Sequence, residues 1–110
     1  MGDLKQKINI LGTEYGVYVD DDTCMKMNAD GICKAYDKQI LIRSLDKYLC
    51  EDDSEEVKLV RMKEVCRHEA IHAFFDESGL ADYSADEQLV DWIARQFPKM
   101  LKVFKDMNAI

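Results

Sequence analysis

Residues 65–79 read VCRHEAIHAFFDESG, and this stretch decides how the second half of the chain folds. Apolar residues recur through it and before it at helical spacing, which predicts a long helix with one apolar face. The segment at residues 52–54 offers N-caps, and Asp53 with Glu56 fits a capping box. Ser78-Gly79 is a suitable stop, because glycine is common just after a helix ends.

Residues 84–107 continue the helical pattern beyond a short loop. Ser84 is expected to start a second helix, and Ser84 with Glu87 fits a capping box. Pro98 is expected to kink or end that helix, and residues 100–107 to form a further amphipathic piece that packs on the first helix. The alternative is that its apolar residues form an exposed stripe for a partner. Trp92 and the phenylalanines are expected to lie in the core; these are Phe74, Phe75, Phe97 and Phe104.

The first 45 residues instead show the alternation of β-strands. Residues 7–10 and 15–19 predict a hairpin about Gly12-Thr13, residues 20–31 a loop, and residues 32–36 and 39–43 two more strands. The predicted fold class is α+β, with a small antiparallel or mixed sheet of three to four N-terminal strands packed on two to three C-terminal helices. We expect one domain over residues 1–110, β-rich over 4–45 and helical over 53–107.

The net charge of −7 excludes several partners. No basic stripe is present to neutralise phosphates, so we expect neither nucleic acid nor a membrane as a partner. No signal peptide or apolar membrane-spanning run is evident, which predicts a cytoplasmic protein. The cysteines lack CxxC spacing and are expected to be free thiols; they are Cys24, Cys33, Cys50 and Cys66.

The chain's two histidines both lie in the stretch His68-Glu69-Ala70-Ile71-His72. Residues four apart share one helical face, so His68 and His72 can converge on one Zn²⁺. Glu69, at the edge of that face, can take a proton from zinc-bound water. The alternative is a helix that carries two histidines on a partly buried face without a metal. The paired spacing with the intervening glutamate favours one zinc ion.

A catalytic zinc needs a third protein ligand, which must here be a carboxylate or a cysteine. Glu87 and Asp91 lie four apart on the next helix, so Glu87 can bind the metal and Asp91 can accept the second ring N–H of a ligand histidine. The alternative for Glu87 is the capping box with Ser84. Asp76 shares the face of His72 and is a weaker candidate for a supporting hydrogen bond. Tyr83 lies in the loop between the two predicted helices and is a candidate contact to the substrate or the transition state.

These residues resemble the gluzincin metallopeptidases, the thermolysin-like class with HExxH followed by ExxxD on a later helix. The resemblance implies His68, His72 and Glu87 as ligands, Glu69 as base and Asp91 as the partner of His68. Residues 68–80 and 90–99, with residues 8–12 and 32–42, are also similar to small zincin-like proteins of bacteriophages and prophages. That similarity implies a minimal zincin-like fold and a host cytoplasm, but no substrate.

The expected function is therefore that of a zinc metallopeptidase, which hydrolyses peptide bonds by Glu69-assisted attack of zinc-bound water on a peptide or protein substrate. Residues 39–44 are the expected edge strand that holds the substrate by main-chain pairing. One alternative is a catalytically silent zincin fold that binds a host or phage protein, with zinc as a structural staple. Another is a helical interaction module without metal. The sequence does not indicate the oligomeric state.

Overall fold

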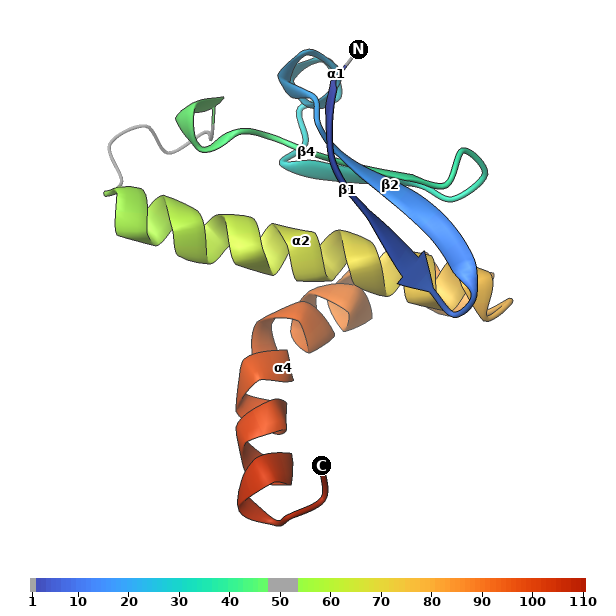
Figure 1. The fold of residues 1–110 in the computed structure, drawn as a ribbon, viewed down its shortest axis with the longest axis vertical. Helices are drawn as coiled ribbons and strands as arrows, with labels where there is room; N and C mark the ends of the chain where they lie inside the picture. The colour runs from blue at the N-terminus through green and yellow to red at the C-terminus, as the bar shows by residue number, and fades with distance from the viewer. Residues whose placement is uncertain (1, 48–53) are drawn as a thin grey trace.

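The computed structural model describes residues 2–47 and 54–110, which form one sheet and a group of helices. The strands are β1 (Asp3–Ile10), β2 (Thr13–Val19), β3 (Gly31–Lys34) and β4 (Gln39–Ile42). The helices are α1 (Asp21–Lys26), α2 (Glu55–Glu77), α3 (Ala81–Ser84) and α4 (Glu87–Asp106), with a 3-10 turn at Leu45–Lys47. The sheet lies on one side of α2, and α4 leads away from the other side (Figure 1).

The sheet is mixed, in the order β1-β2-β4-β3, so the α+β prediction is confirmed. β1 and β2 form the predicted antiparallel hairpin, and β4 runs parallel to β2 and antiparallel to β3. Leu11 and Gly12 join β1 to β2 with φ of 52° and 95°, the positive values that a tight hairpin turn requires. β1 and β3 are therefore the edge strands, while β4 lies inside the sheet.

The core lies between the sheet and α2. Its buried members are Ile10, Tyr15, Ile40, Ile42 and Ala73. Apolar side chains on one face of the sheet pack against one face of α2, and their burial holds the sheet against the helix.

A hydrogen-bonded carboxylate joins the C-terminal end of α2 to the sheet. Glu77 accepts from Thr13 Oγ1 at 2.7 Å, from Tyr15 OH at 2.6 Å and from Lys38 Nζ at 2.7 Å. The hydrogen bonds from Lys38, Tyr15 and Thr13 favour the ionised form and lower the pKa of Glu77 to about 2. Burial and the nearby Glu77 carboxylate raise the pKa of Tyr15.

The predicted loop over residues 20–31 is wrong in part, because it contains α1. Asp20 caps this helix by accepting from the Thr23 backbone N–H at 3.1 Å and the Thr23 hydroxyl at 2.8 Å. Asp21 and Asp22 then lie in the first turn, where the helix dipole favours acid. The aspartates that indicated a loop are thus the cap and first turn of a helix.

The helices after α2 also differ from the prediction. Ser54 caps α2 through the Val57 N–H, while residue 53 of the predicted capping box lies outside the described residues. Asp86, not Ser84, caps α4 by accepting from Leu89 N at 3.1 Å, so the Ser84–Glu87 capping box does not form. α4 then continues through Pro98 as one helix.

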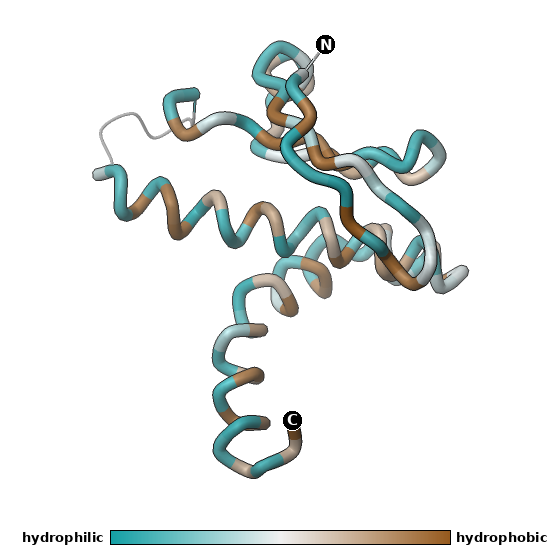
Figure 2. Tube along the Cα trace, in the orientation of Figure 1, coloured by the Kyte–Doolittle hydropathy of each residue, from teal (hydrophilic) through white to brown (hydrophobic). Residues whose placement is uncertain are grey.

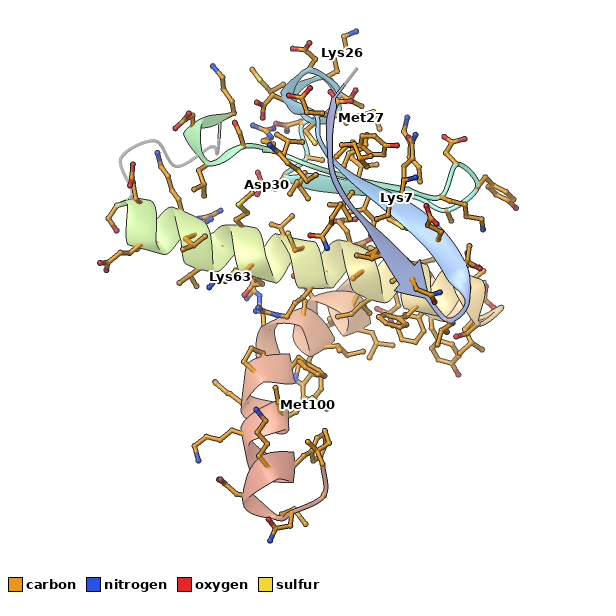
Figure 3. All side chains as sticks on the ribbon, viewed as in Figure 1. Lys7, Lys26, Met27, Asp30, Lys63 and Met100 are labelled. Carbon is orange, nitrogen blue, oxygen red and sulfur yellow. The ribbon has the colours of Figure 1, made fainter. Side chains whose placement is uncertain are left out.

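The C-terminal half of α4 does not pack on α2 as expected. Met100 lies on the part of α4 that extends away from α2 (Figure 3), and apolar residues recur along this part (Figure 2). The prediction of an aromatic core is wrong for three residues, since Phe74 is 43 %, Trp92 55 % and Phe97 42 % exposed. Phe75 and Phe104 are partly buried. Among the described residues, no helix is apolar over enough of its length to cross a bilayer.

Candidate metal centre and substrate cleft

Three side chains from α2 and α4 bring their ligand atoms together. The Nε2 atoms of His68 and His72 are 3.1 Å apart, since the residues stand one turn apart on α2. Glu87, in the first turn of α4, places Oε2 3.0 Å from His68 Nε2 and Oε1 3.1 Å from His72 Nε2. Both histidines are largely buried, while Glu87 is exposed toward solvent.

The separations and chemistry of this group fit zinc. Ligands at about 2.0–2.1 Å from a tetrahedral ion stand about 3.3–3.4 Å apart. The two Nε2 atoms are 3.1 Å apart, and with one oxygen taken from Glu87 the three ligand atoms lie within 4.8 Å of one another. Two imidazole nitrogens with one carboxylate are a common set for catalytic zinc. His68, His72 and Glu87 can therefore hold a metal ion.

The hydrogen-bond partner of His68 strengthens this fit. Its Nδ1 lies 3.0 Å from Asp91 Oδ1, and an ionised carboxylate can only accept, so Nδ1 carries the hydrogen. A neutral His68 then directs the lone pair of Nε2 at the Glu87 carboxylate, 3.0 Å away. Two acceptors at this distance repel one another unless a cation or a proton lies between them.

Glu69 lies beside this group and under β3. It is 7 % exposed, and its Oε2 is 4.0 Å from His68 Nε2. Burial raises the pKa of Glu69 to about 7; His68 opposes the rise and Glu87 adds to it. A carboxyl group placed here can exchange a proton with a water at the ligand atoms.

Two hollows meet at Glu69. A cleft of about 450 Å³ is lined by Asp30, Gly31, Arg61, Glu64, Val65, His68, Glu69, Asp91 and Arg95. A second hollow of about 230 Å³ is lined by Cys33, Glu69, His72, Asp76, Ser84 and Glu87. Gly31 and Cys33 are alternate residues of β3 and so share one face of it. β3 therefore runs along both hollows.

This arrangement corrects the predicted substrate strand. β4 (Gln39–Ile42) pairs with β2 on one side and β3 on the other, so residues 39–44 do not form an edge strand. The edge strand at the site is β3. The sequence did not distinguish the two, because strand order depends on pairing between distant segments.

The other predicted site residues fall in different places. Asp91 lies where the prediction put it, against His68 Nδ1, and Asp76 lines the second hollow. Tyr83 is 54 % exposed, stacks on Phe75 with ring centroids 6.1 Å apart, and lines neither hollow.

Sequence reasoning missed Ser84 and Gly31. Ser84 is 7 % exposed, and its Oγ lies 3.2 Å from His72 Nδ1. A Cβ on Gly31 would lie 2.7 Å from Val65 Cγ1 and 2.9 Å from Glu69 Cγ. Ser84 lies 12 residues from His72, whereas Gly31 and Val65 belong to distant segments, and neither Ser84 nor Gly31 belongs to a recognisable spacing with the histidines.

In comparisons with known proteins, no family model, curated protein or solved structure matched this chain. The similarity to zincin-like phage proteins therefore stays a prediction, and the function is argued from the site itself.

Proposed function

We propose that the protein is a zinc-dependent peptidase. The observation that carries the proposal is the convergence of His68, His72 and Glu87, with the buried Glu69 carboxylate 4.0 Å from His68 at the meeting point of two hollows. A structural zinc site would have four protein ligands, whereas the described residues offer three. With three protein ligands, a bound zinc would keep a position for water or substrate, and this favours a catalytic over a structural role.

Zinc, when bound at such a site, polarises a carbonyl and makes water more acidic. Glu69 would take the proton from the attacking water and deliver it to the leaving amine. His68 and His72 would keep their Nε2 lone pairs directed at the ion, and Asp91 would hold the ring of His68 through Nδ1.

The substrate would be an extended peptide segment. The free edge of β3 can pair with a main chain, and the hollows on either side of Glu69 leave space for residues on both sides of the cleaved bond. This favours internal bonds of a peptide or an unfolded protein segment. The free thiols at Cys24, Cys33 and Cys66 support work in a reducing compartment such as the cytoplasm.

The test uses the full chain loaded with one equivalent of zinc and a defined mixture of synthetic peptides, with products identified by mass spectrometry. Glu69→Gln should keep its zinc and lose about 10²- to 10⁴-fold in cleavage rate. Glu56→Gln is a matched control, because it changes the same group on an exposed turn of α2 remote from the site. Zinc-loaded protein that cleaves none of the peptides, or a Glu69→Gln variant as active as the wild type, would contradict the proposal.

A second candidate is a catalytically silent zinc protein that binds another protein. The exposed apolar residues of α4, Trp92, Phe97 and Val103, favour it, because such surfaces commonly meet a partner. The same Glu69→Gln variant separates the two. If the Glu69→Gln protein has the same biological effect as the wild type, catalysis is not the function and zinc has a structural role. A folded protein that takes up no zinc would contradict both the peptidase and the silent zinc protein, and would favour an interaction module without metal.

A further inference from the structure

The hydroxyl of Ser84 contacts His72 at two points. Its Oγ lies 3.2 Å from the ring nitrogen Nδ1 and 3.3 Å from the backbone carbonyl oxygen of the same residue. Ser84 is the last residue of α3 and is 7 % exposed. The short helix α3 thus brings a buried hydroxyl against α2, beside the second predicted zinc ligand.

The two contacts fix where the hydrogens lie. The hydroxyl has one hydrogen, and the carbonyl oxygen of His72 can only accept it. Nδ1 must then carry its own hydrogen and donate to Ser84 Oγ. Only this arrangement of hydrogens makes both contacts hydrogen bonds at the same time. Neutral His72 would therefore have its lone pair on Nε2, the atom that lies 3.1 Å from both Glu87 and His68 Nε2.

We propose that Ser84 is a positioning residue, which holds the ring of His72 in the tautomer and orientation that a metal on Nε2 requires. The identity of the metal rests on the function proposed above; the hydrogen-bond assignment does not. The two histidines then differ in support, because Asp91 offers His68 a charged acceptor and Ser84 offers His72 a neutral one. The hydroxyl acts mainly by orienting its ring, since it adds less to the basicity of the ligand than a carboxylate does.

The first test measures zinc affinity by competition with a chromophoric chelator. Ser84→Ala should weaken zinc binding about 10- to 100-fold, and Ser84→Thr, which keeps the hydroxyl, should recover most of it. Ser78→Ala is the matched control, because the Ser78 hydroxyl also donates to an α2 carbonyl, that of Phe74 at 2.7 Å, but contacts no histidine. Circular dichroism checks folding; if Ser84→Ala is unfolded, Ser84→Cys, similar in volume but a weak donor, replaces it.

The second test reads the ring directly. The chain has two histidines, so ¹H–¹⁵N correlations of the imidazoles at pH 8 without metal contain two ring systems. Ser84→Ala should lower the fraction of His72 with hydrogen on Nδ1, and Ser78→Ala should not. Unchanged His72 shifts with unchanged zinc affinity would overturn the role of Ser84. A wild type that binds no zinc, but whose His72 shifts respond to Ser84→Ala, would defeat the proposed function and keep this inference.

Discussion

Replacing Gly31 with alanine should separate metal binding from catalysis. The new Cβ would lie 2.7 Å from Val65 Cγ1, 2.9 Å from Glu69 Cγ and 3.1 Å from Glu69 Oε2. Carbon atoms in contact normally stand about 3.5–4.0 Å apart, so the overlap is about 1 Å. Either β3 must retreat from α2 or the Glu69 side chain must move.

The size of the effect follows from this overlap. Overpacking of this kind typically costs about 1–3 kcal/mol, and each kcal/mol is about 4–8 °C in Tm for a domain near this size. A displacement of about 1 Å at a reacting group can lower a rate about 10²-fold. The predicted zinc ligands lie on α2 and α4 rather than on β3, so zinc affinity should stay near that of the wild type.

The assay compares zinc affinity, Tm and peptide cleavage in three variants. Gly31→Ala should bind zinc, melt earlier and cleave about 10²-fold more slowly. Adding Val65→Ala removes the closest clashing atom and should recover part of the Tm, but not the rate, because the contact with Glu69 remains. Lys34→Ala, at the exposed far end of β3, is the control. Wild-type cleavage by zinc-loaded Gly31→Ala would refute the view that β3 sets the position of Glu69.

Two further predictions concern stability. A free zinc concentration about 100 times Kd stabilises the fold by about 2.7 kcal/mol, so removing zinc with a chelator should lower the Tm by about 10–20 °C. Glu87→Gln should reduce this difference in Tm. A Tm that is the same with and without zinc would contradict a metal centre. The pKa of Glu77 is lowered from 4.5 to about 2, so its stabilising effect is complete above about pH 5.5 and is lost as the pH falls toward 2. The Tm difference between wild type and Glu77→Gln, measured by circular dichroism, should therefore be largest near neutral pH and shrink between pH 5 and 2; a difference independent of pH would exclude this role of the Glu77 charge.

The local elements of the fold could be predicted because their causes are local. The hairpin about Gly12 and the stop at Gly79 follow from backbone conformations that glycine allows, and both have positive φ. His68 and His72 share a face through helical spacing alone. Glu87 and Asp91 could be paired for the same reason, although their distance from the histidines depends on how α4 meets α2.

The remaining features depend on how separate elements of the fold pack together. β4 was expected at the edge because it directly precedes α2 along the chain, yet β3 pairs outside it. Ser84 carried a plausible capping signal, but Asp86 competes for the same role and leaves the Ser84 hydroxyl to His72. Trp92 and Phe97 had core-like spacing, but spacing does not say whether a second layer covers that face of the helix.

The predicted zinc ligands and their hydrogen-bond partners all lie within residues 68–91, on α2, α3 and α4. Contacts of such short sequence separation form early in folding, whereas the docking of β3 over Glu69 requires a longer loop to close. We therefore expect the predicted ligands to capture their ion before β3 docks over Glu69. Hydrolytic competence would then begin only when β3 docks, which would restrain a newly synthesised, partly folded chain from cleaving its neighbours.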